Sequence, residues 1–600
     1  MDFSLGLKVR NENDELKNTE FDIQGNTIIN FDIALDFDSY DAPNTSFALG
    51  QAGAENTFAG NFVNLVLQRE WKNDDPEAKL DLSHNDWGTT DPEEVRTRID
   101  ASEEFLNQFV VLADQPTTKL ATLISIDSSY TENNADEYKY GYDAFNNIDE
   151  ALPYLATGGL ILVNDGTYEA PLWIDRPMHI KGNGDQVKLV EHASLAAETQ
   201  SEMTTVVAPG VKFENLHFDG KFIGLRFKDY RPKQYNVKKY ESVAHSFEVT
   251  DCTFTGFKSV AINAEFSYSD KTFDNAKVVI KDNDISRHLD EKYDYGTGIS
   301  LSLYDIDIDV EIENNKIHGD YVSGIYARYG NNAIVKNNDV KVSSYSNKHY
   351  GIYVSVGGNA LIVDNHVENQ LENEDDLGTR GIYLNVDDEN NKNVFSNRIK
   401  GFDEGIHVHG LKKRDYSNIL VGGSEANANY LSDNRFGLAA TLLDINKQSL
   451  NATYNQWGVI DADLPAYIRD ENYKADYSPV DYFPSVLSPL NDDANLKSLS
   501  ATGLQLTPEF DPDTLTYTAT VTYYLNRTTV SVETNDISAK AEINNLNVKQ
   551  LLVDLIVGNN TIEVKVVSPD GTKTLTYTLE ITREPEPEPE EPPMYRLLLK

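Results

Sequence analysis

The chain has 600 residues, of which 97 are acidic and 52 are basic, giving a formal net charge of −45 at pH 7. This charge argues against nucleic acids and anionic membranes as partners, because both require a positive face, and it restricts any polyanion contact to a local site. The single cysteine, Cys252, excludes an intramolecular disulfide. No run of 18 apolar residues occurs, so we expect no membrane-spanning helix.

The first 115 residues contain two landmarks that return later in the chain. Residues 26–35 parallel residues 397–406 at an offset of 371, and the Trp-Gly motif at 85–88 parallels the one at 455–458 at an offset of 370. Two landmarks at nearly the same offset indicate a duplicated structural unit rather than chance.

A short phrase of Gly-Ile recurs between residues 298 and 407, with spacings of 26, 27, 30 and 24 residues. An Asn that is followed two residues later by an aliphatic residue precedes each copy. The residues after each Gly alternate between apolar and polar, which is typical of strands and not of helices. Strands this short bury an apolar face only when successive repeats stack, so the pattern predicts a parallel β-solenoid. The five copies are Gly298-Ile299, Gly324-Ile325, Gly351-Ile352, Gly381-Ile382 and Gly405-Ile406, and the five Asn are Asn283, Asn315, Asn338, Asn365 and Asn397.

These repeats resemble the right-handed parallel β-helix (pectin-lyase-like) family. Residues 141–152 and 158–168 look like the amphipathic capping helix and first strand of secreted members, and residues 451–458 with 480–484 look like their closing segment. A cap is needed because the end of an open solenoid exposes unpaired backbone. By the same resemblance, residues 1–115 are the final coils of a preceding β-helix, and we expect the chain to be a fragment of a longer protein with tandem β-helices.

Short runs rich in Thr, Val and Tyr, separated by turn residues, extend from residue 495 to residue 577. This pattern suits a β-sandwich, and its motifs resemble the bacterial cadherin-like β-sandwich family, whose members are spacer or adhesive modules. We therefore predict an all-β chain in five parts. They are the end of a preceding β-helix at 1–115, a linker at 116–140, a capped parallel β-helix at 141–488, the sandwich at 489–583, and a Pro/Glu-rich linker and tail at 584–600.

Alternation also predicts which side chains point outward. Extending the phrase upstream to Leu225 and Ile262 gives an inward ladder, and the residues that follow it form an outward row. Coils repeat about every 4.8 Å, so three tyrosines of this row should form an exposed strip about 10 Å long. Candidate glycan-binding residues are those of the strip and its neighbours, Tyr326, Arg328, Tyr353, Tyr383, Asn385, His407 and His409.

Aromatic faces with hydrogen-bonding neighbours suit sugar rings, and an Arg suits a uronate carboxylate. The alternative is that the tyrosines only stabilise the sheet through cross-strand contacts. Catalysis is a further alternative, because many β-helix proteins are polysaccharide lyases or glycoside hydrolases. Arg398-Ile399-Lys400 matches one short pectin-hydrolase motif, but the paired aspartates and the Gly-His-Gly that precede it in that family are not present in order. Arg328, His407 and His409 with Asp387 and Asp388 are suitable groups for a lyase, although three coils separate Arg328 from the histidines.

Two further features concern metal and thiol chemistry. Carboxylates alternate with aliphatic residues between residues 305 and 313, so Asp305, Asp307, Asp309 and Glu311 are candidate Ca²⁺ ligands, against the alternative of a solvated acidic face. No cofactor is required by the sequence. Cys252 stands where later coils have Asn, which predicts a small buried filler rather than a reactive thiol.

Together these patterns predict a secreted or cell-surface β-solenoid protein with an adhesive, glycan-contacting or surface-layer role. The partners we expect are a polysaccharide or cell-surface glycan and further domains of the same protein, with no nucleic acid. The alternative is a polysaccharide lyase or glycoside hydrolase that acts on an acidic polysaccharide.

Overall fold

The computed structural model describes residues 5–586 apart from a set of gaps. Asp305 and Asp387, which belong to the predicted metal and lyase groups, lie outside the described residues, as does most of the predicted tail at 584–600. The gaps are 12–19, 30, 32, 40–45, 60, 62, 68–79, 103–105, 108–109, 114–115, 117, 136, 193–200, 231–241, 244, 267–275, 288–295, 305–306, 344–348, 372–377, 387, 445–447, 460–462, 476, 486–491, 537–538 and 570–572.

The first unit consists of short parallel strands stacked over their own apolar core. The sheets pair in the orders β1-β4-β7-β9, β2-β5, β3-β6 and β10-β8, all parallel. Its elements are β1 (Leu5–Asn11), β2 (Glu20–Ile23), β3 (Thr27–Ile29), β4 (Ile33–Ser39), β5 (Ser46–Leu49), β6 (Thr57–Ala59), β7 (Val63–Leu67), β8 (Leu80–Asp81), α1 (Pro92–Thr97), β9 (Ile99–Asp100) and β10 (Val110–Val111).

The sequence echo between this unit and the end of the main solenoid extends to its hydrogen bonds. Asn61 donates to the carbonyl of Ile28 and accepts from the amide of Phe31, as Asn434 does with Ile399 and Phe402. The two Trp-Gly motifs also end in a glycine with φ near +73°, at Gly88 and Gly458. The duplicated landmarks therefore mark duplicated structure. That residues 1–115 are the end of a longer β-helix stays a prediction.

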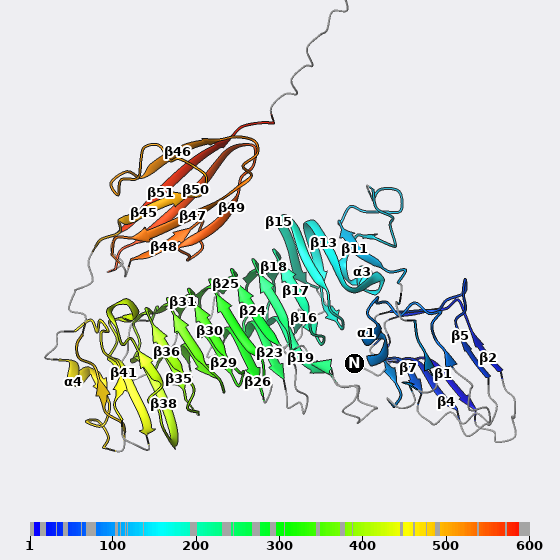
Figure 1. Ribbon diagram of the computed structural model, residues 1–600, viewed down its shortest axis with the longest axis horizontal. Coiled ribbons are helices and arrows are strands. Elements are labelled where there is room, and N and C mark those ends of the chain that lie inside the picture. The colour runs from blue at the N-terminus through cyan, green and yellow to red at the C-terminus, as the bar shows by residue number, and fades with distance from the viewer. Residues whose placement is uncertain are drawn as a thin grey trace, which may run out of the picture.

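The main solenoid is a parallel β-helix whose middle coils each contain three short strands (Figure 1). Two strands of each coil belong to a 22-stranded sheet, and the third belongs to a 12-stranded sheet.

The 22-stranded sheet contains β11 (Ala121–Ile126), β12 (Ala144–Phe145), β13 (Leu155–Ala170), β15 (His179–Glu191), β17 (Val211–Glu214), β18 (His217–Asp219), β21 (Phe247–Thr250), β22 (Thr253–Thr255), β24 (Lys277–Lys281), β25 (Asp284–Arg287), β27 (Asp309–Glu313), β28 (Lys316–Gly319), β30 (Ala333–Lys336), β31 (Asp339–Val342), β33 (Ala360–Val363), β34 (His366–Asn369), β36 (Lys392–Phe395), β37 (Arg398–Lys400), β39 (Ile419–Val421), β40 (Tyr430–Ser432), β42 (Leu450–Asn451) and β44 (Val480–Asp481). The 12-stranded sheet contains β14 (Leu172–Ile174), β16 (Glu202–Val206), β19 (Ile223–Tyr230), β20 (Ser242–Val243), β23 (Val260–Phe266), β26 (Thr297–Leu303), β29 (Ser323–Arg328), β32 (Tyr350–Ser355), β35 (Arg380–Asn385), β38 (Glu404–Arg414), β41 (Phe436–Asp444) and β43 (Ile468–Arg469).

A ladder of buried asparagines joins successive coils at the turn between the two strands of the larger sheet. Each amide donates to the side chain of the next Asn, and also to a backbone carbonyl of the preceding coil, as Asn365 does to Asn397 and Val335 at 2.9 and 2.8 Å. The residue before most of these Asn has a positive φ, for example 57° at Asp364, which turns the chain sharply at that point. Cys252 precedes the ladder and donates its amide to Asn283 at 3.0 Å, so it occupies the predicted Asn position and is buried.

The Gly-Ile phrase belongs to the smaller sheet and faces the core. Its isoleucines pair in register from Ile299 to Ile406 and are fully buried, which confirms the predicted inward ladder. The glycine is required by space: a Cβ on Gly351 would lie 2.2 Å from Val367 and 2.7 Å from the carbonyl of Gly381. The phrase therefore recurs because two strands of each coil approach closely at this position.

Short helices lie at both ends of the β-helix. The helix at the start is shorter than the predicted segment 141–152: α3 (Ile148–Ala151) and the 3₁₀ turn η1 (Leu152–Tyr154) follow the two-residue strand β12. The side chain of Asn147 caps α3 by accepting from the amide of Glu150 at 2.8 Å, so the helix begins only there. At the far end, Trp457 is buried and α4 (Leu464–Tyr467) packs beside β41, while the turn η4 (Glu425–Asn427) lies between β39 and β40.

The C-terminal domain is a sandwich of a three-stranded and a four-stranded sheet. Figure 1 shows it alongside the later coils of the β-helix, with the first unit at the opposite end. The ion pair between Lys540 and Asp339, 3.0 Å apart and with side chains 8% and 9% exposed, joins the sandwich to the β-helix. The strands of the sandwich are β45 (Leu496–Ala501), β46 (Thr516–Val521), β47 (Arg527–Thr534), β48 (Lys540–Ile543), β49 (Gln550–Asp554), β50 (Gly558–Val567) and β51 (Thr574–Arg583).

Candidate functional site

The outward row of the 12-stranded sheet has the register that the sequence predicts. Tyr326, Tyr353 and Tyr383 lie opposite one another on β29, β32 and β35, and His407 continues the row on β38. The ring centroids are 4.4 Å apart for the first tyrosine pair and 5.2 Å for the second, with interplanar angles of 18° and 6°. We call these three residues the tyrosine stack.

The prediction of exposure is wrong for Tyr353, in the middle of the predicted strip, and for His407, at the end of the row. Tyr353 is 9% exposed and His407 is 5% exposed, and Tyr350 packs against both Tyr353 and Tyr383 at about 5 Å. Burial raises the pKa of Tyr353 to about 12, so its phenol stays neutral. Because stacked rings cover each other's faces, Tyr353 offers little surface to a sugar, which favours the alternative that this tyrosine stabilises the sheet.

At the end of the tyrosine stack nearest β26, the residues that the structure describes place no further ring on Tyr326, and we call this the open end. Tyr326 lies opposite Ser300, whose side chain is too small to cover a phenol ring. Arg328 lies 4.0 Å from the ring centre of Tyr329 and 5.8 Å from that of Tyr304, and these two rings are 4.2 Å apart. Tyr304 is exposed, and Tyr329 has φ of +69°, a conformation that costs an ordinary residue roughly 1–2 kcal/mol. We call Tyr304, Tyr326, Arg328 and Tyr329 the Arg328 cluster.

A second polar group lies at the other end of the stack, around Glu404 on β38. Glu404 accepts from Arg380 at 2.9 Å and from Arg469 at 2.6 Å, and lies 2.6 Å from His407 Nδ1. The other nitrogen of His407, Nε2, lies 2.8 Å from Thr441 Oγ1, and His409 Nδ1 lies 2.7 Å from the same oxygen. We call these residues the Glu404 cluster: Arg380, Glu404, His407, His409, Thr441 and Arg469.

The charges of the Glu404 cluster follow from its contacts. Burial opposes ionisation of Glu404, but the hydrogen bond to His407 and the charges of His407, Arg380 and Arg469 outweigh it and lower its pKa to about 2. Burial lowers the pKa of His407 below its usual value, and the contact with Glu404 offsets this only in part. The cluster at neutral pH is therefore a carboxylate beside a neutral imidazole, held by two guanidinium groups.

The remaining predicted residues are placed apart from one another. Asn385 lies on the same face and donates to Ser355 Oγ at 2.9 Å. Arg328 on β29 is separated by three coils from His407 and His409 on β38, so the structure does not bring together the groups predicted for a lyase.

The predicted calcium row lies on the larger sheet. Glu311 forms ion pairs with Lys277 and Lys281, and Asp309 accepts from the side chain of Asn332 at 2.8 Å, while Asp307 is exposed. Within the described part of the chain, no three His, Cys, Asp or Glu side chains are grouped so that they could hold a metal ion. Calcium binding stays a prediction without a formed site here.

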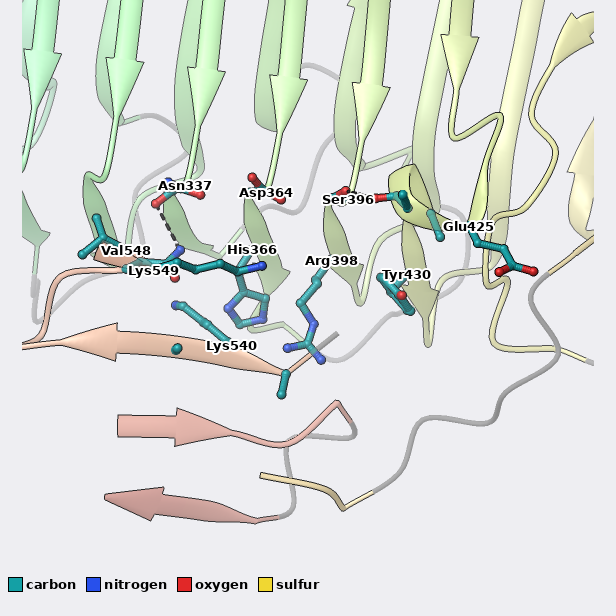
Figure 2. Close-up of a pocket in the computed structure, with 15 residues that line it drawn as sticks. Asn337, Asp364, His366, Ser396, Arg398, Glu425, Tyr430, Lys540, Val548 and Lys549 are labelled. Carbon is teal, nitrogen blue, oxygen red and sulfur yellow. Dashed lines mark hydrogen bonds between the residues drawn. The ribbon is translucent and has the colours of Figure 1, made fainter. Parts of the chain in front are cut away.

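A cavity of about 140 Å³ lies between the β-helix and the sandwich (Figure 2). Figure 2 shows His366 and Arg398 of the β-helix directed toward the strand that carries Lys540. Arg398 donates to the carbonyl of Pro569 at 2.6 Å, and Asp339 pairs with both Lys540 and His366 at 3.0 and 2.9 Å. These polar groups hold the two domains together, so we assign the cavity to the domain interface.

Sequence reasoning missed several residues of both clusters. Arg380 and Glu404 each stand one residue before a Gly-Ile phrase, and Thr441 stands four residues after Gly437 in a coil where the phrase reads Gly-Leu. Writing out the residue that precedes each Gly-Ile phrase would have found Arg380 and Glu404. Accepting Gly-Leu as a further copy of the phrase would have found Thr441.

Comparisons with known proteins agree with this fold. Residues 240–437 match the family "Right handed beta helix region", and residues 496–584 match the family "Cadherin-like beta sandwich domain". The chain therefore carries a right-handed β-helix followed by a cadherin-like β-sandwich, as the sequence motifs indicated. Domains of both classes are typical of extracellular proteins and fit a surface or carbohydrate-related protein.

A solved structure, that of pectin methylesterase PemA from Erwinia chrysanthemi, is 12% identical over 60% of this chain and 99% of its own, with a TM-score of 0.19. At this TM-score the likeness carries no argument about activity. A comparison with curated proteins gives no match. None of the helices in the described residues is long and apolar enough to cross a membrane.

Proposed function

We propose that the chain belongs to a secreted or cell-surface β-solenoid protein that contacts an acidic polysaccharide through the outer face of its 12-stranded sheet. Such contact would serve adhesion or a place in a surface layer, and the cadherin-like sandwich fits a spacer in either setting. The observation that carries the proposal is the Arg328 cluster, in which Arg328 lies against the rings of Tyr304 and Tyr329 and shares its strand with Tyr326 at the open end of the stack.

The chemistry of the Arg328 cluster suits a uronate residue. Tyr304 is exposed, and within the described part of the chain only Tyr353 stacks on Tyr326, so both tyrosines offer flat surfaces to the C–H groups of a sugar. Arg328 offers a planar guanidinium, which binds a carboxylate through paired hydrogen bonds. Among the residues that the structure describes, no carboxylate forms an ion pair with Arg328.

Net charge explains why such a contact must be local. A chain of −45 repels an acidic polymer over most of its surface. Arg328 and the two arginines at Glu404 lie on the one outer face that carries the tyrosine stack. Attraction to this face should weaken as salt increases, because exposed charges are screened over about 10 Å at 0.1 M ionic strength.

Affinity gel electrophoresis of the full chain tests the proposal, with polygalacturonate or neutral dextran cast in the gel. We expect polygalacturonate to retard the wild type and dextran to leave it unaffected. The variants Arg328→Gln and Tyr326→Ala should lose most of the retardation. Tyr524→Ala is the matched control, because Tyr524 lies on the sandwich and is 80% exposed. Equal migration of wild type and both variants in every gel would overturn the proposal.

A further inference from the structure

Three side chains of the Glu404 cluster form a line of a hydroxyl, an imidazole and a carboxylate. Thr441 Oγ1 lies 2.8 Å from His407 Nε2, and His407 Nδ1 lies 2.6 Å from Glu404 Oε2. The sheet register fixes this geometry, because β38 and β41 pair with Ala439 opposite His407 and Thr441 opposite His409. Alternation then places His407 and Thr441 on the same outer face.

The hydrogen-bond partners assign the protons of this line. His407 Nδ1 lies 3.1 Å from Arg380 Nε and 2.6 Å from Glu404 Oε2, and Arg380 Nε is closer to that same carboxylate oxygen, at 2.9 Å. A carboxylate that is ionised beside Arg380 and Arg469 can only accept, so the short contact assigns the proton of the neutral imidazole to Nδ1. Nε2 is then an acceptor that faces the hydroxyl of Thr441, and His409 Nδ1 donates to the same oxygen. His407 is 5% exposed, while Thr441 is only half-buried, so the hydroxyl is the member of the line that a ligand meets first.

We propose that Thr441, His407 and Glu404 hydrolyse ester substituents of a polysaccharide that lies along this face. A nucleophile within hydrogen-bond reach of a base, which a third group orients, is the arrangement that acyl transfer requires. Thr441 and His407 are the catalytic residues and Glu404 is a positioning residue. That the ester is carried by a polysaccharide rests on the proposed function, whereas the acyl-transfer chemistry rests on the distances within the cluster.

The reaction balances without any reactant other than water. Thr441 Oγ bonds to the ester carbonyl carbon as its proton moves to His407 Nε2, and the C–O bond to the alcohol breaks as that proton passes to the leaving oxygen. Water then gives a proton to His407 and bonds to the acyl carbon. The bond to Thr441 Oγ breaks, the hydroxyl recovers the proton, and a carboxylic acid leaves.

Labelling and hydrolysis by the full chain test the triad. A fluorophosphonate probe should phosphonylate one site, located at residue 441 by peptide mass spectrometry, and 4-nitrophenyl acetate should be hydrolysed. Thr441→Val keeps the branched shape but should lose labelling and at least ~100-fold in kcat/KM, and His407→Gln should lose ~10²–10⁴-fold. Thr441→Ser should restore both signals, and Thr520→Val, on the exposed face of the sandwich, should match the wild type.

Equal labelling and hydrolysis by wild type and Thr441→Val would overturn the triad, with thermal melting used to show that both are folded. Glu404→Gln adds a readout specific to positioning, since the ¹⁵N signals of His407 should shift away from the Nδ1–H tautomer as hydrolysis falls. Gel retardation by polygalacturonate separates the two proposals. Retardation without hydrolysis would overturn the triad alone, and hydrolysis without retardation would overturn the polysaccharide as its substrate.

Discussion

The inner and outer sides of the β-helix use the same repeat in opposite ways. Inside, the isoleucine ladder and the asparagine ladder repeat one residue type in coil after coil. Outside, the row beside the isoleucines changes from Arg226 through Ser300 and the tyrosine stack to His407. A constant inner side holds the coils in register, so the variable outer side is free to carry chemistry. Side chains that break the repeat are therefore the ones to examine for function.

The largest effect should come from breaking the inner side at Asn365. The variant Asn365→Ala leaves the carbonyl of Val335 and the amide of Asn338 without their partners at a buried position. Each orphaned group costs about 1–3 kcal/mol, so we expect a loss of ~3–5 kcal/mol. Scanning calorimetry should show a lower Tm for the β-helix. Asn359→Ala, in an exposed position, is the control, and an equal Tm for the two variants would contradict the role of the buried ladder.

The next largest effect on stability should come from lowering the pH, through Glu404, which lies on the outer side of the β-helix but is buried. The pKa of Glu404 is about 2 in the folded chain against an ordinary value of 4.5, so its stabilisation is complete above pH 4.5 and is lost as pH falls toward 2. The lowered pKa of His407 acts in the same direction below pH 6.5, because the unfolded chain takes up the proton first.

Melting curves between pH 7 and pH 2 measure this effect. We expect the difference in stability between wild type and Glu404→Gln, up to ~3 kcal/mol at neutral pH, to shrink as the pH falls. A difference that stays constant across this range would show that the charge of Glu404 contributes nothing.

A smaller effect on stability should distinguish Tyr353, inside the tyrosine stack, from Tyr326 at its open end. Tyr353 has a ring on each side and is nearly buried, whereas Tyr326 has one stacked neighbour among the residues that the structure describes. We expect Tyr353→Ala to cost ~2 kcal/mol and Tyr326→Ala ~1 kcal/mol or less, since each aromatic contact adds about 0.5–1.5 kcal/mol. Gel retardation should follow the reverse order, with Tyr326→Ala losing more. The same ranking in both measurements would contradict the assignment of glycan contact to the open end.

The smallest effect concerns Cys252, the inner residue that departs from the asparagine ladder. Burial raises the pKa of its thiol to about 12, so almost no thiolate forms at pH 8. We expect a disulfide reagent such as Ellman's to leave the native chain unlabelled and to react with one equivalent of thiol after denaturation. Rapid labelling of the native chain would show that this coil opens.

The sequence predicts the fold better than the site, for a physical reason. The register of neighbouring strands follows from the alternation of apolar and polar residues. The Gly-Ile phrase was therefore sufficient to align Tyr326 with Tyr353 and Tyr383 and to place Arg328 apart from His407. Exposure depends on how rings fill the space between coils, and the sequence did not reveal that Tyr350 covers Tyr353. Glu404, Thr441 and Arg469 meet across gaps of 37 and 28 residues, at positions where the repeat is imperfect, so only the folded coils show them as one cluster.

Docking of the sandwich limits how the length of the β-helix can change. Each coil adds about 4.8 Å, and the bonds that join coils are alike, so a coil inserted or deleted elsewhere would change little but the length. The sandwich is anchored at Asp339 on β31 and at Arg398 on β37, which lie two coils apart. A variant with one coil more or fewer between Asp339 and Arg398 can therefore form only one of these two contacts. The docked sandwich thus fixes the number of coils in this stretch.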